Sequence, residues 1–209
     1  MRVIIAPDSF KESLSASKVA LAIAEGIQIV DYQARIVCIP MADGGEGTVE
    51  ALVTATSGEI IAVPSVDALS RPIDSFYGVL GDSKTAIIEM AAASGLELLS
   101  VKEQNPLITS TYGTGLLLKA AIDAGFQKII IGIGGSATND GGAGMADRRG
   151  FKLLDKNGQS IGLGGNSLAN LFKIDRSEVH PILASVKITI ACDVQNPMLG
   201  ASGATSVYG

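Results

Sequence analysis

Short apolar runs alternate with segments of helical periodicity along most of the chain. The runs at residues 2–6 and 34–40 are blocks of apolar residues instead of alternations of apolar and polar positions. Such blocks are typical of strands in a parallel sheet that is covered on both faces. We predict further buried strands of the same kind at residues 128–134 and 186–194.

Helical periodicity predicts the segments that connect these strands. Ser15 suits the N-cap of a helix whose inward apolar positions are Val19, Ile23, Ile27 and Val30. Two further helices are expected at residues 48–57 and at about 112–124, where Gly58 and Gly125 are placed to end them. Shorter helices are expected within residues 91–99 and 162–171. The alternation of strands and helices indicates an α/β protein.

The middle of the chain follows a different pattern. Residues 59–90 contain several short strand-like runs with no helix-length segment between them. Gly81, Asp82 and Ser83 form a plausible hairpin turn, so this region is expected to be antiparallel. We interpret it as the start of an inserted subdomain near Val66, which divides the chain into residues 1–65 and 66–209.

Composition excludes several classes of protein. Hydrophobic residues make up 47% of the 209 residues and charged residues 18%, as in ordinary globular proteins. The net charge of −5 and the lack of a long basic run argue against nucleic-acid binding, and the apolar runs are too short to span a bilayer. Cys38 and Cys192 lie in apolar runs, so we expect buried free thiols and a cytoplasmic protein.

Polar residues follow the predicted parallel strands. Because parallel strands present their carboxyl ends at one edge of a sheet, the loops after them are expected to share one crevice. The candidate side chains are those of Asp8, Ser9, Lys11, Asp43, Glu46, Ser136, Asn139, Asp140, Asp193 and Asn196. Glu46 also suits a partner for a helix dipole, and Asn139 and Asp140 also suit turn formation.

Glycines in the same loops suggest anion binding. Gly44, Gly45 and Gly47 precede a predicted helix, whose N-terminus favours phosphate, and Gly134 and Gly135 follow a strand. The carboxylates repel phosphate but suit Mg²⁺, which bridges to phosphates. Lys11 is placed to neutralise a transferring phosphoryl group, and a carboxylate is placed to accept a hydroxyl proton. These residue types fit phosphoryl transfer to a small hydroxylated substrate.

Two other interpretations stay open at this point. Residues 132–137 match the dinucleotide fingerprint G-x-G-x-x-A, which would make the protein an oxidoreductase with Asp155 on a ribose. The polar glycine loop that follows does not suit that fingerprint. A chain that binds anions without turnover is the non-catalytic alternative. No Walker P-loop sequence occurs.

Five segments together resemble the type I glycerate kinases. They read APDSFKESLSA, MADGGEGT, TSTYGTG, GIGGSATNDGGAGM and CDVQNP, and they occur in this order across the chain. The resemblance implies ATP-dependent phosphorylation of glycerate to a phosphoglycerate, with Mg²⁺. It also implies a discontinuous, flavodoxin-like parallel-sheet domain, a second inserted α/β domain, and an active site in the cleft between them. A homodimer is left open.

The resemblance also suggests roles for individual residues. Asp8, Lys11 and Asp193 are expected to be catalytic, and Asp43 and Asp193 to hold the metal ion. Substrate and phosphates are expected to contact Ser9, Gly44, Gly45, Glu46, Gly47, Gly134, Gly135, Ser136, Asn139, Asp140 and Asn196.

The sequence departs from the family pattern in two places. The charged pair Arg148-Arg149 stands where the family has a small apolar turn, and it either weakens helix packing or faces solvent. The family also continues beyond the final GATSVYG. We therefore expect this chain to be the N-terminal part of a longer protein.

Overall fold

The computed structural model describes residues 1–10 and 13–208. Its strands are β1 (Arg2–Ile5), β2 (Arg35–Cys38), β3 (Glu59–Val66), β4 (Pro72–Val79), β5 (Thr85–Glu89), β6 (Lys128–Gly132), β7 (Lys152–Leu154), β8 (Lys173–Asp175) and β9 (Lys187–Ala191). Its α-helices are α1 (Ala16–Val30), α2 (Thr48–Thr56), α3 (Ala91–Ser94), α4 (Tyr112–Asp123), α5 (Ala143–Asp147) and α6 (Ala204–Tyr208). Short 3₁₀ helices are η1 (Leu96–Leu98), η2 (Gly165–Asn170) and η3 (Pro181–Ser185).

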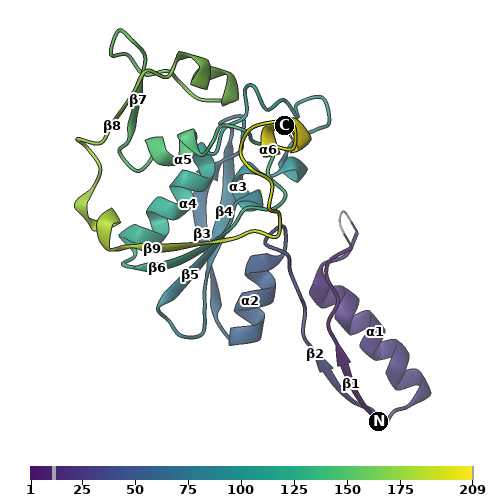
Figure 1. Cartoon of the computed structure of the whole chain (residues 1–209). Coiled ribbons are helices and arrows are strands. Elements are labelled where there is room, and N and C mark those ends of the chain that lie inside the picture. The colour runs from purple at the N-terminus through teal and green to yellow at the C-terminus, as the bar shows by residue number, and fades with distance from the viewer. Residues whose placement is uncertain (11–12, 209) are drawn as a thin grey trace.

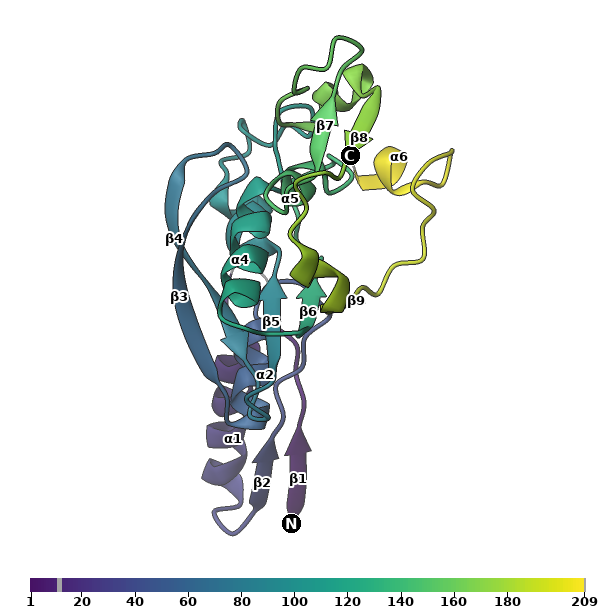
Figure 2. The same cartoon turned by 90° about the vertical axis from the view of Figure 1, so that its left-hand side faces the viewer.

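The N-terminal strands form a small sheet of their own. β1 and β2 pair in parallel, as predicted, and α1 packs on one face through Ile5, Ala20 and Ala24. This unit extends from one end of the molecule, and the β7–β8 hairpin lies at the opposite end (Figures 1 and 2). The sequence predicted that this sheet is covered on both faces. For the described residues that prediction is wrong, because Ile4, on the face opposite α1, is 61% exposed.

The helix α1 begins where the sequence predicts, and the Ser15 hydroxyl accepts a hydrogen bond from the Lys18 amide. Its inward face is narrower than the prediction. Val19 and the alanines Ala16, Ala20 and Ala24 are buried, whereas Ile23 is 42% and Val30 89% exposed. A two-stranded sheet covers only part of the helix, which explains the exposed apolar positions.

The larger sheet has five strands in the order β3-β4-β5-β6-β9. β3, β4 and β5 pair antiparallel, and β5, β6 and β9 pair in parallel. The predicted antiparallel middle region and the turn around Asp82 are confirmed, since the backbone reverses between β4 and β5. The protein is therefore a mixed α/β fold with parallel strands in its main sheet.

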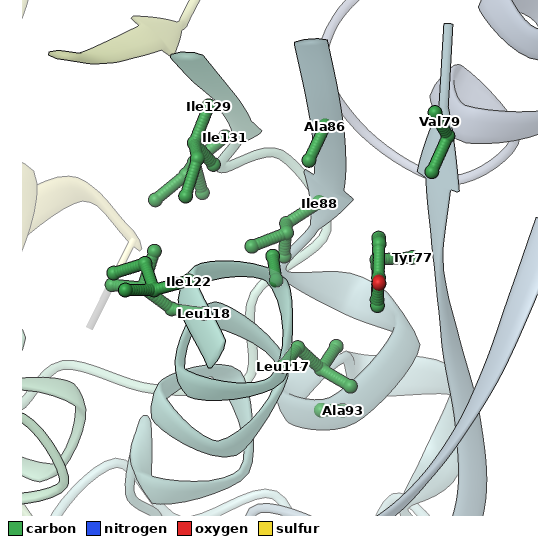
Figure 3. Close-up of a cluster of buried hydrophobic side chains, with 11 residues drawn as sticks. Tyr77, Val79, Ala86, Ile88, Ala93, Leu117, Leu118, Ile122, Ile129 and Ile131 are labelled. Atoms are coloured by element: carbon green, nitrogen blue, oxygen red, sulfur yellow. The ribbon is translucent and has the colours of Figure 1, made fainter. Parts of the chain in front are cut away.

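Helices cover both faces of this sheet. On one face, Ala86 and Ile88 of β5 pack with Leu117 and Leu118 of α4 in the main core (Figure 3). On the other face, Ile87 packs on α2. Successive side chains of a strand point to opposite faces, so the continuous apolar run of β5 serves both layers.

The change from the small sheet to the larger one falls between Cys38 and Thr48, because α2 and β3 pack in the larger unit. The division of the chain into domains between residues 65 and 66 stays a prediction. Some predicted burials differ from the structure. β9 is an exposed edge strand instead of a buried one, since among the described residues its only neighbour in the sheet is β6. Cys38 and Cys192 are free, as expected, but exposed. Among the described helices, none is long and apolar enough to cross a membrane.

Candidate functional site

The loops after β2 and β6 meet each other and the last residue of β9 at the carboxyl ends of the parallel strands. The Gly134 amide donates to the Gly44 carbonyl at 3.0 Å. A Cβ on Gly134 would lie 2.7 Å from the Gly45 Cα, and one on Gly44 would lie 2.8 Å from the Ala191 oxygen. No side chain fits at such distances, so these positions require glycine. The loops therefore touch through their backbones.

The loop after β1 lies beside the same region. The Met41 amide donates to the Pro7 carbonyl at 2.8 Å, which aligns this loop with the segment after β2. The Ser9 side chain helps to line an open pocket of about 290 Å³, together with Glu46, Gly47 and Glu89. Predicted residues from the loops after β1 and β2 are therefore brought together. Lys11 lies outside the described residues.

Glu89 is buried beneath the start of α2. It ends β5 and is 3% exposed, and its Oε2 accepts the Val49 amide at 3.2 Å. The amides of Gly47 and Thr48 also stabilise its charged form. Burial nevertheless raises the pKa of Glu89 above its ordinary value near 4.5. Glu89 thus fixes the start of α2 and the glycine loop before it.

Sequence reasoning missed Glu89. The signal was an acidic residue directly at the end of an apolar strand, in the run TAIIE. A strand end of this kind lies at the edge where open α/β sheets bind ligands. The carboxylate sits under the helix start instead of in the solvent, and only the three-dimensional packing shows this.

The raised pKa of Glu89 predicts a pH-dependent stability. The folded protein binds the proton of the Glu89 carboxyl more tightly than the unfolded chain does. The contribution of Glu89 to the unfolding free energy is therefore fully present below about pH 4.5. That contribution is lost as the pH rises through the raised pKa. Glu89→Gln keeps an acceptor for Val49 and does not ionise, so its stability relative to wild type should increase over this window. Chemical unfolding from about pH 4 to about pH 7 measures the difference.

Glu50→Gln serves as the control for removal of a carboxylate, because Glu50 is exposed on α2, the helix whose first turn Glu89 contacts. If the unfolding free energies of Glu89→Gln and wild type stay parallel across this range, the assignment of Glu89 as a costly buried charge is wrong.

Asp140 is held inside the protein. It is 1% exposed, and its Oδ2 accepts the amides of Thr111 at 2.9 Å and Gly144 at 3.1 Å. The hydroxyls of Ser110 and Thr111 and the Gly142 amide also donate to this carboxylate. Asp140 therefore joins the start of α4 to the loop before α5. Its role in substrate binding stays a prediction, and the structure shows a positioning function.

Other predicted residues hold the loops in shape. The hydroxyls of Ser136 and Thr138 are 2.6 Å apart. The Asn139 Oδ1 accepts the Thr205 hydroxyl at 3.3 Å, which joins α6 to the loop after β6. The Asn196 amide donates to the Ser202 carbonyl at 2.8 Å. The segment after β9 thus returns to the loop after β6.

The predicted catalytic and metal-binding carboxylates are exposed at strand ends. Asp8, Asp43 and Asp193 are all exposed, and Asp43 Oδ1 accepts the Gly45 amide at 2.9 Å. Within residues 1–10 and 13–208, no group of three or more His, Cys, Asp or Glu side chains is arranged to hold a metal ion. The protein therefore presents separate carboxylates beside a backbone cradle of glycines.

These features define an α/β protein with glycine-rich loops gathered at the carboxyl ends of parallel strands. The model of the glycerate kinase family matches residues 3–209, and the chain belongs to this family. It is 55% identical over its whole length to a glycerate kinase of Bacillus subtilis and 51% identical to a glycerate 2-kinase of Escherichia coli. A crystal structure from Salmonella typhimurium LT2, described as glycerate kinase 2, is 50% identical, covers 100% of this chain, and superimposes with a TM-score of 0.86.

The chain spans about half the length of the relatives that it matches, namely 55% of the B. subtilis and E. coli proteins and 56% of the Salmonella chain. The family match gives no support to the dinucleotide interpretation of residues 132–137. The structure agrees, because α5 begins only at Ala143 and a loop intervenes where the dinucleotide fingerprint needs a helix.

Proposed function

We propose that this chain acts in the ATP-dependent phosphorylation of glycerate to a phosphoglycerate. One observation carries the proposal: in a member of the glycerate kinase family, Gly44 and Gly45 meet Gly134 and Ala191 through their backbones at the carboxyl ends of parallel strands. Backbone amides in glycine-rich loops suit phosphate and carboxylate groups, and both are present in the substrates of such a kinase.

The residues divide between binding and chemistry. The glycine loops would orient the transferred phosphoryl group and the glycerate carboxylate. Lys11 would neutralise charge that develops on the phosphoryl oxygens. Asp193 or Asp8 would accept the proton of the attacking hydroxyl, because both carboxylates stand exposed at strand ends. Glu89 would act indirectly, as a positioning residue, since it fixes the start of α2.

The residues present fit Mg²⁺, which the family implies. Asp43 and Asp193 would supply hard oxygen ligands, because Gly44, next to Asp43, meets Ala191 at the end of β9, two residues before Asp193. Bound Mg²⁺ would neutralise charge on the phosphates during transfer. Since a cluster of three ligating side chains is lacking in the described part of the chain, the nucleotide phosphates and water would complete the coordination.

The names of the relatives extend the proposal to the position of transfer. The E. coli relative is named glycerate 2-kinase, so we place phosphorylation on the 2-hydroxyl of glycerate. A cytoplasmic location and a homodimer remain predictions from the sequence.

An ADP-release assay with the purified protein, ATP, glycerate and Mg²⁺ tests the proposed function. The expected result is ADP release that depends on glycerate and stops when EDTA removes the metal, with a phosphorus NMR signal for 2-phosphoglycerate. A reaction without glycerate controls for simple ATP hydrolysis. Nucleotide binding in calorimetry with no phosphorylated product would contradict the proposal and favour the non-catalytic, anion-binding alternative.

A further inference from the structure

Among the residues that the structure describes, Arg149 is a buried cation whose side chain has no hydrogen-bonding partner. It follows α5 and is 7% exposed. Its Nε is fully buried and unpaired, and no hydrogen bond or ion pair of its side chain occurs in the part of the chain that the structure describes. Burial lowers the pKa of Arg149, and the charge of Asp123 opposes this effect. A buried charge without a partner is costly, so such groups usually have a counter-ion.

Arg149 lines an open pocket of about 400 Å³, which we call the Arg149 pocket. The other charged or titratable residues around it are Lys119, Asp123, Arg148, Glu178 and His180. The pocket lies beside the last turn of α4, whereas the candidate functional site lies at the strand ends near the first turn. It is therefore a separate place on the molecule.

The charges around the pocket do not cancel. Lys119 pairs with Asp123, and Glu178 pairs with Lys152, so both nearby carboxylates already have cationic partners. The His180 Nδ1 accepts the Ile182 amide at 3.2 Å. The guanidinium groups of Arg148 and Arg149 remain as the excess positive charge.

Arg148 is held in place by an aromatic ring. Its Nη1 donates to the Tyr112 hydroxyl at 3.0 Å, and its guanidinium lies 5.1 Å from the centre of that ring. Its Nε is buried and unpaired, like the Nε of Arg149. The sequence left open whether this arginine pair weakens helix packing or faces solvent. In the structure both side chains are at least partly buried beside the pocket.

We propose that the Arg149 pocket binds a small anion that carries a phosphate group, with Arg149 as its buried counter-charge. The planar guanidinium fork matches phosphate oxygens, and Arg148 adds a second positive charge at the same pocket. The pocket is larger than a single phosphate needs and admits a small phosphorylated organic acid. The bound phosphate supplies the negative charge that balances Arg149.

Calorimetry and thermal melting test this proposal in a chloride buffer without phosphate. The two probes are inorganic phosphate and 3-phosphoglycerate. The probe that binds more tightly shows whether the pocket prefers free phosphate or a phosphorylated organic acid. Arg149→Met should weaken binding at this site by at least about tenfold. The same variant should melt at a higher temperature than wild type without phosphate, because it removes an unpaired buried charge. Arg149→Lys keeps the charge but loses the fork, so it should also bind more weakly.

Arg176→Met is the matched control, because Arg176 is exposed and does not line the pocket. It should bind both probes as wild type does. Equal phosphate affinity in wild type, Arg149→Met and Arg149→Lys would overturn the proposal, and so would an equal loss of affinity in Arg176→Met. Anions held at the glycine loops are distinguished by stoichiometry, since the arginine variants should lose only one class of site. The test is independent of kinase activity.

Discussion

Replacing Gly134 with Ala should lower both the stability and the activity of the protein. The new Cβ would lie 2.7 Å from the Gly45 Cα and 2.8 Å from the Gly45 nitrogen, so a backbone would have to move. Overpacking of this kind costs about 1–3 kcal/mol of unfolding free energy. A shift of about 1 Å in the loops that orient the reactants would lower kcat by about 10²-fold. Chemical unfolding and the ADP-release assay measure the two effects.

Gly26→Ala is the matched control for this change. A Cβ on Gly26 meets nothing within 4 Å, and the residue lies inside α1, where Ala is favoured over Gly. This control should keep full activity and show equal or higher stability. Wild-type activity in Gly134→Ala would mean that the contact between the loops after β2 and β6 does not shape the active site.

Local sequence patterns predicted most elements of the fold. The helix at residues 48–57 appears as α2, and the segment predicted at about 112–124 appears as α4. Their periodicity and their terminal glycines are local signals that tertiary packing did not override. The antiparallel middle region followed from strands with no helix between them, a signal that is equally local.

Burial was harder to predict because it depends on distant neighbours. The apolar run of β9 resembles that of β6, yet β9 lies at the edge of the sheet and is mostly exposed. Ile190 of β9 is 50% exposed, whereas Ile131 beside it is 1% exposed. The order of strands in the sheet decides this difference, and a single run of apolar residues contains no information about that order.

The candidate site was predicted in part. Glycines in the loops after β2 and β6 marked the backbone cradle, because their need for close approach shows in the sequence. The different roles of the individual carboxylates could not be predicted from the sequence. Asp140 is buried with many donors and Glu89 lies under a helix start, whereas Asp193 is exposed. The environment of each carboxylate decides its role, and contacts between distant segments create that environment.

Asp193→Asn should abolish most of the kinase activity and leave the fold intact. Asp193 follows β9 at the edge where the loops meet, and its side chain is exposed. The amide has the same shape but accepts no proton at neutral pH and binds Mg²⁺ weakly. Loss of a general base alone lowers kcat by about 10²- to 10⁴-fold. The ADP-release assay measures kcat, and thermal melting checks the fold.

The comparison with Asp74→Asn separates chemistry from general electrostatics. Asp74 is exposed on β4, remote in the sheet order from β9, and its replacement removes the same charge. The unfolding free energy of each variant should lie within about 0.5 kcal/mol of the wild-type value, because exposed substitutions seldom cost more. Only Asp193→Asn should lose activity. If it keeps more than about a tenth of the wild-type kcat, Asp193 is neither the base nor an essential metal ligand, and Asp8 and Asp43 become the carboxylates to which those roles must be assigned.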